Sequence, residues 1–321
     1  MKTIYFRTRG GAKQGWGNIY RILLIYNLLK KNNRLLFIYE GNREVNQYLN
    51  QKKIKFLRLK EGISLKEEKK IISKLYKPDL TIIEMLECNF SRQKIYKNIS
   101  KKLVVFDDIL SKKYCADLLV CAQKKYNEKK HKNSLIGYEY YPLRKEFKKY
   151  LNKQKNIKKK ISNILICLGG SSYITAYKKL INFFKKKNYN VTFVFGNEKE
   201  KIVKNKVKIK KFNFIKTTDD IAKLLFNSDL AIVGGGYIKI EAAYMNTPMV
   251  VFPVQKHQQK LVKNFKKFCK VPYLPSPKNT RPKDIEKMIK FYNHNKRNEI
   301  HKILKRKFKK NKFYQVLRKI I

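Results

Sequence analysis

The sequence has few acidic residues, no paired cysteines and no long apolar run. Its 321 residues include 23 Asp and Glu against 77 Lys and Arg, which gives a formal net charge of +54. No apolar run approaches the ~20 residues that a membrane-spanning helix needs. The N-terminal MKTIYFRTRGG lacks the apolar core of a signal peptide. Because 43% of the residues are hydrophobic, we expect a folded chain. Because neither a membrane-spanning run nor a signal peptide is present in this sequence, we expect a cytoplasmic location.

The cysteines and histidines indicate neither a disulfide framework nor a metal site. The five cysteines form no CxxC pair and are odd in number, and the four histidines show no metal-ligand spacing. We therefore expect reduced, mostly buried thiols, and neither a metal nor a cofactor.

The basic residues are spread along the whole chain. Lysine greatly outnumbers arginine, and Asn, Ile and Tyr are abundant, which is typical of AT-rich coding bias. No zinc finger, RNA-recognition signature or basic heptad is present, so no specific nucleic-acid partner is expected. Two roles remain for the charge: steering of a phosphorylated substrate, and peripheral contact with an anionic membrane, where each lysine contributes about 1 kcal/mol.

Apolar runs of strand length alternate with helical patterns in both halves of the chain. This alternation predicts two Rossmann-like α/β domains with parallel sheets. They span residues 1–150 and 161–321, joined by a lysine-rich segment at Lys145–Lys160, and the final helices can pack back on the first domain. The expected strands are Thr3–Arg7, Arg34–Tyr39, Ile54–Leu59, Leu80–Ile83, Leu103–Phe106, Leu118–Cys121, Asn163–Leu168, Asn190–Phe195, Leu230–Val233 and Met249–Phe252.

One stretch, Asp229–Gln259, carries the clearest functional pattern. A buried strand is followed by three glycines, Gly234–Gly236, and a helix is expected over Ile238–Tyr244. Glycines permit positive φ and close approach of a ligand to the backbone, and a helix N-terminus favours an anion. The pattern fits a diphosphate site, or a tight turn with no ligand. Glu241, one helical turn further, favours the nucleotide because a carboxylate can hold a ribose diol.

Glycine-rich or acidic segments follow several of the predicted strands. Ligands of open α/β sheets bind at the carboxyl ends of strands. Those ends carry Gly15–Arg21, Gly169–Ser172 and Gly234–Gly236. Two domains built in this way are expected to face a cleft.

Gly15–Arg21, with the sequence GWGNIYR, resembles the G-x-G-H-x-x-R motif of the PseG family. These enzymes are the UDP-2,4-diacetamido-2,4,6-trideoxy-β-L-altropyranose hydrolases of pseudaminic acid biosynthesis, and related spore-coat polysaccharide proteins share the motif. Further similar segments follow in family order up to about Phe268: Val105–Asp108, Ala116–Leu119, Leu135–Gly137, Tyr141–Phe147, Leu168–Ser171, Gly234–Glu241 and His257–Gln258.

The resemblance implies the GT-B fold of MurG-type glycosyltransferases, with UDP held mainly by the second domain. It implies a UDP-sugar as the substrate. The binding residues that it implies are Gly17, Arg21, Gly169, Gly170, Ser171, Gly234, Gly235, Gly236, Tyr237, Glu241, His257 and Gln258.

The chain departs from the family at the expected catalytic base. Asn18 stands where the family has histidine, and an amide can orient water but cannot take its proton. Attack at the anomeric carbon still needs a base on the face opposite the leaving group. Asp107, Asp108 and Glu84 lie at predicted strand ends and can supply a carboxylate, although the two aspartates fit loop capping equally well.

Three functions remain open from the sequence. The first is a UDP-amino-sugar hydrolase of the PseG type, which releases UDP in a pathway to pseudaminic acid or another surface glycan. The second is a GT-B glycosyltransferase with a UDP-sugar donor, and the third is a non-catalytic nucleotide-sugar binding protein. Neither the sugar nor the oligomeric state is encoded in a recognisable way.

Overall fold

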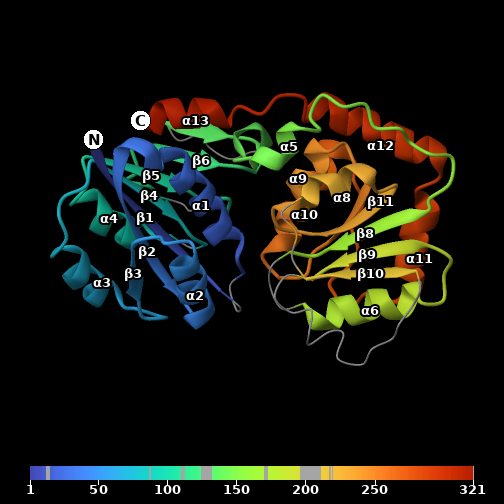
Figure 1. Cartoon of the computed structure of the whole chain (residues 1–321), viewed down its shortest axis with the longest axis horizontal. Helices are drawn as coiled ribbons and strands as arrows, with labels where there is room; N and C mark the ends of the chain where they lie inside the picture. The colour runs from blue at the N-terminus through green and yellow to red at the C-terminus, as the bar shows by residue number, and fades with distance from the viewer. Residues whose placement is uncertain are drawn as a thin grey trace. The chain divides into compact units, whose positions relative to one another are not determined.

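The computed structural model describes residues 1–11, 15–86, 88–109, 113–123, 132–169, 173–195, 211–216, 218 and 220–320. The chain forms two compact units (Figure 1). The first comprises Met1–Pro142 together with Asn311–Ile321, and the second comprises Leu143–Lys310. The last helix, α13 (Phe313–Ile320), therefore belongs to the first unit.

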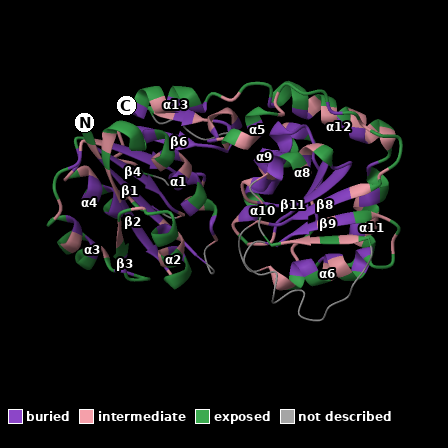
Figure 2. Ribbon diagram, in the orientation of Figure 1, coloured by how far each residue is buried: buried purple, intermediate pink, exposed green. Residues whose placement is uncertain are grey.

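The first unit is built on a seven-stranded parallel sheet with the order β3-β2-β1-β4-β5-β6-β7. Figure 2 shows that its strands are largely buried, and most of their buried residues are apolar, as expected of a parallel sheet covered on both faces. The strands are β1 (Lys2–Gly10), β2 (Asn33–Gly41), β3 (Phe56–Leu59), β4 (Leu80–Glu84), β5 (Lys102–Phe106), β6 (Leu118–Cys121) and β7 (Ser134–Ile136).

Helices cover both faces of this sheet. One apolar cluster joins the sheet to α1, α2 and α13, and a second joins its other face to α3 and α4. The helices are α1 (Gly17–Leu29), α2 (Arg43–Gln51), α3 (Leu65–Ile72) and α4 (Phe90–Lys97), with 3-10 turns η1 (Lys30–Asn32) and η2 (Tyr138–Tyr140).

The second unit has a five-stranded parallel sheet with the order β10-β9-β8-β11-β12. Helices α8, α9, α10 and α12 pack together, and α6 packs with α11 (Figure 1). The elements are α5 (Lys145–Lys148), β8 (Asn163–Cys167), α6 (Ile174–Phe184), β9 (Asn190–Val194), β10 (Phe212–Ile215), α8 (Ile221–Asn227), β11 (Leu230–Gly234), α9 (Ile238–Tyr244), β12 (Met249–Phe252), α10 (Gln258–Cys269), α11 (Pro282–Phe291) and α12 (His294–Lys307).

The segment assigned to a domain junction, Lys145–Lys160, belongs to the second unit. Lys155 is buried, and its Nζ donates hydrogen bonds to the Leu225 and Phe226 carbonyls and to Thr247 Oγ1. An amine donor at the C-terminal end of α8 satisfies carbonyls that have no partner within the helix. The buried Lys155 side chain therefore anchors this lysine-rich segment to α8.

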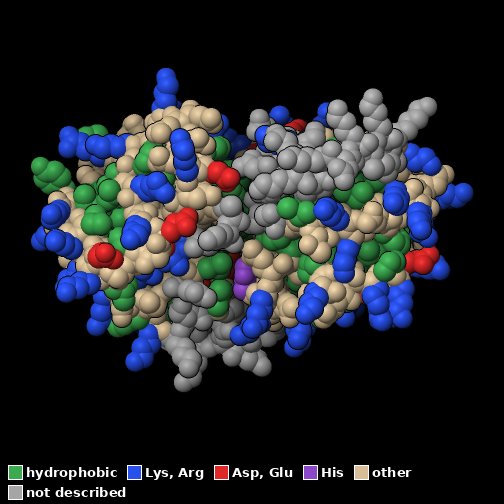
Figure 3. Space-filling model, turned by 90° about the horizontal axis from the view of Figure 1, so that it is seen from below, with side chains coloured by type: hydrophobic (Ala, Val, Ile, Leu, Met, Phe, Trp, Pro, Cys, Tyr) green, Lys and Arg blue, Asp and Glu red, His purple; other side chains and the backbone are tan. Residues whose placement is uncertain are grey.

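Most of the other lysines and arginines among the described residues are at least partly exposed; the buried ones are Arg7, Arg21, Arg92, Lys239 and Arg297. Figure 3 shows Lys and Arg side chains scattered over the visible face without gathering in one patch. Within the part of the chain that the structure describes, no helix is long and apolar enough to cross a membrane.

Candidate functional site

The strand order of the second unit reverses between β8 and β11, which pair in parallel. The carboxyl ends of these two strands border a topological switch point, where doubly wound sheets bind their ligands. Gly169 follows β8 at this point, and Gly234–Gly236, hereafter the glycine turn, ends β11. The structure thus brings two of the predicted binding segments together.

Each glycine of the turn has a different environment. A Cβ atom at Gly234 would lie 2.1 Å from the Leu168 carbonyl oxygen, and one at Gly235 would lie 2.9 Å from Gln258 Cβ. At Gly236 the nearest atom would be Gln258 Nε2, at 3.8 Å, so that position is open. None of the three has φ in the left-handed region. Close packing against Leu168 and Gln258 therefore explains the first two glycines, and the turn does not use the positive φ that glycine permits.

A buried tyrosine, Tyr177, forms a hydrogen bond with the backbone of the turn after β8. Tyr177 Oη accepts a hydrogen bond from the Leu168 N–H at 2.9 Å and donates to the Val194 carbonyl at 2.6 Å. Gly169 has a φ of +107°, a conformation that favours glycine. The other predicted residues of this turn, Gly170 and Ser171, lie outside the described residues.

Gln258 lies against the glycine turn. Its Oε1 accepts a hydrogen bond from the Val254 N–H at 3.0 Å, and its Nε2 lies beside Gly236. His257 is the N-cap residue of α10 and Tyr237 is the N-cap residue of α9, and neither side chain caps its helix. Of these predicted residues, the structure places Gln258 in contact with the turn.

Glu241 is ion-paired. Arg144 donates from Nε to Oε1 and from Nη2 to Oε2 of Glu241, each at 3.1 Å. The same guanidinium reaches Glu146 Oε1 at 3.0 Å and lies over the Phe147 ring. Burial raises the pKa of Glu146, although Arg144 opposes that shift. The carboxylate expected to hold a ribose is thus held here by Arg144, which the sequence analysis did not assign to the site.

The first unit has its own switch point, between β1 and β4. Arg21 is buried there, and it donates from Nε to Glu84 Oε1 and from Nη1 to Asp108 Oδ2, the latter at 3.0 Å. Asp108 Oδ1 accepts a hydrogen bond from the Ala122 N–H at 2.9 Å. Arg21 therefore joins α1 to the carboxyl ends of β4 and β5.

Asp107 has different partners from Asp108. Its Oδ1 accepts from the Ile109 N–H at 2.8 Å and its Oδ2 accepts from the Tyr114 hydroxyl at 2.7 Å. Both aspartates are buried. The Ile109 N–H, two residues further along the chain, binds Asp107 in the geometry of loop capping. The Tyr114 hydroxyl is a donor of the kind that a substrate or water could also supply.

Asn18 and Gly17 open helix α1. Asn18 is the second residue of the helix, one turn before Arg21, and its Nδ2 lies 3.5 Å from the Arg9 carbonyl oxygen. That distance is at the outer limit of a hydrogen bond. The Asn18 amide is therefore only weakly held by the protein.

A second buried ion network, which the sequence analysis missed, lies on the other face of the first sheet. Arg7 is fully buried in β1 and donates to Glu68 Oε1 at 2.7 Å and to Glu40 Oε2 at 3.0 Å. Arg92 and Tyr96 donate to the same Glu68, at 2.7 and 2.8 Å. Removal of one partner from a buried pair leaves an uncompensated charge and costs about 3–5 kcal/mol, so loss of one member of this network should destabilise the fold.

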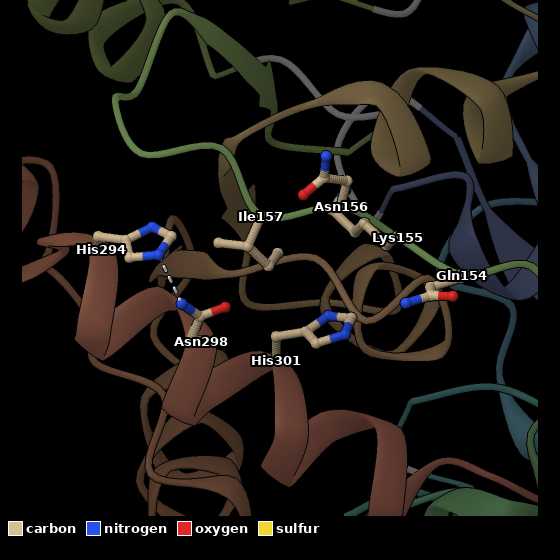
Figure 4. Close-up of a pocket in the computed structure, with 7 residues that line it drawn as sticks. All are labelled: Gln154, Lys155, Asn156, Ile157, His294, Asn298 and His301. Carbon is tan, nitrogen blue, oxygen red and sulfur yellow. Dashed lines mark hydrogen bonds between the residues drawn. The ribbon is translucent and has the colours of Figure 1, made fainter.

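A cavity of about 670 Å³ lies beside α12 in the second unit (Figure 4). His294 Nε2 contacts Asn298 Nδ2 at 3.0 Å, and His301 Nδ1 contacts the Asn246 carbonyl at 2.9 Å. Burial lowers the pKa of Lys155, which also lines the cavity, to about 7. Since these polar groups already bind the protein itself, we assign no ligand to the cavity.

Comparison with known proteins identifies the fold. The computed structure is similar to the crystal structure of MurG from Acinetobacter baumannii, with a TM-score of 0.70 and 13% identity over 100% of this chain and 99% of that chain. It is also similar to CalG4, the calicheamicin glycosyltransferase, with a TM-score of 0.68 and 10% identity over 100% and 97% of the two chains. The chain has the GT-B fold of these glycosyltransferases, with two Rossmann-like units, as the sequence predicted.

Sequence comparison gives narrower matches. The family model of the glycosyltransferase family 28 C-terminal domain matches residues 164–320. The chain is 29% identical over 268 residues to an uncharacterised protein, MJ1062, of Methanocaldococcus jannaschii, covering 76% of this chain and 54% of that protein. It is 31% identical over 116 residues to the spore coat polysaccharide biosynthesis protein SpsG of Bacillus subtilis, covering 34% of each.

The chain therefore spans about half of the length of MJ1062 and about a third of that of SpsG. The matches confirm the similarity to spore-coat polysaccharide and MurG-type proteins. They leave the PseG family itself as a prediction.

Proposed function

We propose that the chain binds a UDP-sugar through its second unit and breaks the bond between the sugar and the diphosphate, releasing UDP to solution with water as the acceptor. This is the activity of a UDP-amino-sugar hydrolase of the PseG type in surface-glycan biosynthesis. The observation that carries the proposal is the glycine turn at a switch point, with Gln258 against it and Glu241 on the following helix. That arrangement lies within the matched residues 164–320.

Backbone groups of the glycine turn would bind the diphosphate. Gly236 offers open space for a phosphate oxygen, because only Gln258 Nε2 lies within 4 Å of where its Cβ would be. The Gln258 amide is a second donor at the same place. A metal is not needed for this role, since N–H groups and lysines can offset the charge of a diphosphate.

Glu241 would bind the ribose hydroxyls while keeping Arg144. An ionised carboxylate has about four acceptor positions, so it can accept from a ribose diol as well as from Arg144. Arg144 would then fix the orientation of the carboxylate.

In the first unit we propose Asp107 as the base that activates water. Glu84 and Asp108 are less suited because both are ion-paired to Arg21. Asp107 accepts from the Tyr114 hydroxyl, a neutral donor that an attacking water can replace.

A glycosyltransferase is the second candidate, and it is favoured by the match to the family 28 C-terminal domain and by the likeness to MurG. In this case an acceptor hydroxyl takes the place of water, and the same carboxylate removes its proton. The cytoplasmic location and a peripheral contact of surface lysines with anionic membrane stay predictions under either function.

A UDP-release assay separates the candidates. UDP formed from a UDP-amino sugar in buffer alone supports the hydrolase, and UDP formed only after an acceptor sugar or lipid is added supports the transferase. Binding of the UDP-sugar in calorimetry without release under any acceptor would leave a non-catalytic binding protein. Asp107→Asn should abolish release while binding persists, and Glu44→Gln, an exposed carboxylate on α2, serves as the matched control.

A further inference from the structure

Lys239 is a buried lysine directly behind the glycine turn. It is the second residue of α9 and stands between the apolar residues Ile238 and Ile240. It has no exposed surface, which is unusual for a lysine. Its Nζ donates hydrogen bonds to the Gly235 carbonyl at 2.9 Å and to the Gly236 carbonyl at 3.0 Å. The amine also lies over the Phe265 ring, 5.7 Å from its centre.

These two hydrogen bonds fix the direction of two peptide groups. In a planar trans peptide the C=O and the N–H of the following residue point in opposite directions, and the described chain has no cis peptide. Because the Gly235 and Gly236 carbonyls both point at Lys239 Nζ, the N–H groups of Gly236 and Tyr237 point away from it. The side of the turn opposite Lys239 therefore presents backbone donors.

The open space at Gly236 lies where such a donor could be used. No backbone or side-chain acceptor among the described residues takes the Gly236 N–H. The helix that follows the turn contributes little to anion binding, because α9 has only seven residues. A positive charge behind the turn would supply what the short helix lacks.

We infer that Lys239 is a positioning residue for the diphosphate: its amine holds the carbonyls of the glycine turn inward, aims the turn's N–H groups at the phosphates, and adds a positive charge behind them. The inference rests on the proposed nucleotide function of this turn. In this role Lys239 contacts the glycine turn and does not contact the ligand.

Lys239→Met and Lys239→Gln test the inference against two ligands, UDP and uridine, by calorimetry. Methionine removes both donor and charge from an apolar site at similar volume, whereas glutamine keeps a neutral donor for the carbonyls. We expect Lys239→Met to weaken UDP binding about tenfold to a hundredfold, with uridine binding changed less than about twofold. Lys239→Gln should fall between Lys239→Met and the parent. Lys263→Met, which removes an exposed lysine from α10, should bind UDP as the parent does.

Each result has one meaning. Equal weakening of UDP and uridine, or unchanged UDP affinity in both variants with the parent binding UDP, would overturn the role of Lys239 while leaving the proposed function in place. If the parent protein binds no UDP, the proposed function fails and the inference falls with it. Should Lys239→Met fail to fold, as judged by its melting temperature, the ratio of UDP to uridine affinity in Lys239→Gln decides.

Discussion

Alanine at Gly236 and at Gly234 should separate ligand binding from folding in the second unit. A Cβ at Gly236 meets nothing closer than Gln258 Nε2 at 3.8 Å, so Gly236→Ala is free of steric conflict. Its φ is not left-handed, and loss of unfolded-state freedom can then stabilise the protein by about 0.4–1 kcal/mol. The new methyl group would occupy the space that we assign to a phosphate oxygen.

The control substitution, Gly234→Ala, is expected to create a steric conflict. A Cβ at Gly234 would lie 2.1 Å from the backbone oxygen of Leu168, which cannot move without shifting β8. Overpacking of this kind costs about 1–3 kcal/mol or more. Gly234→Ala should therefore lower the free energy of unfolding, whereas Gly236→Ala should not.

Urea unfolding and calorimetric titration with UDP measure the two effects. We expect Gly236→Ala to fold as the parent does and to bind UDP at least about tenfold more weakly, equal to about 1.4 kcal/mol. Uridine, which has no phosphates, should bind to the two proteins alike. Parent-like UDP affinity in a folded Gly236→Ala protein would refute the assignment of the glycine turn to the diphosphate.

Three further predictions concern the other residues of the account. Asn18→His restores the base type of the resembled motif; with Asp107 as the base it should change UDP release by less than about tenfold, and a rise of about 10²-fold or more would place the base at position 18 and contradict the role of Asp107. Glu241→Ala should weaken UDP by about 1.5–3 kcal/mol and 2′-deoxy-UDP much less, with Glu146→Ala as the control because it also contacts Arg144; equal losses for both nucleotides would exclude a ribose contact. Burial raises the pKa of Glu68, but Arg7 and Arg92 outweigh it and hold that pKa below 4.5, so its stabilisation is present above pH 4.5 and is lost as the pH falls. Glu68→Gln should lose about 3–5 kcal/mol at pH 7 and show a shallower acid loss than the parent or the exposed Glu61→Gln.

The sequence predicted most of the sheet because parallel strands buried on both faces leave continuous apolar runs. Such runs stand at β4, β5, β8, β11 and β12, each with four or five buried residues. The strand β10, Phe212–Ile215, was not predicted from the sequence. It lies at a sheet edge and is only partly buried, so it lacks a continuous apolar run. Strand order was not predictable, since pairing of β8 with β11 joins segments more than sixty residues apart.

The candidate site was predictable where it is local and was missed where it depends on long-range pairing. The glycine turn, Glu241 and Gln258 stand within one short stretch, and a strand–turn–helix pattern marks it. Arg144 contacts Glu241 from 97 positions away in the chain, and it stood unnoticed within the resembled segment Tyr141–Phe147. In the sequence, Lys239 is a lysine between two isoleucines. Only the structure shows that every residue of its helix is buried.

Titration of the purified chain with UDP in a calorimeter tests the central claim most directly. The account predicts saturable binding of one UDP per chain, tighter than that of uridine because the glycine turn contacts the diphosphate. Absence of UDP binding at millimolar concentration, in protein shown to be folded by its cooperative unfolding, would contradict it.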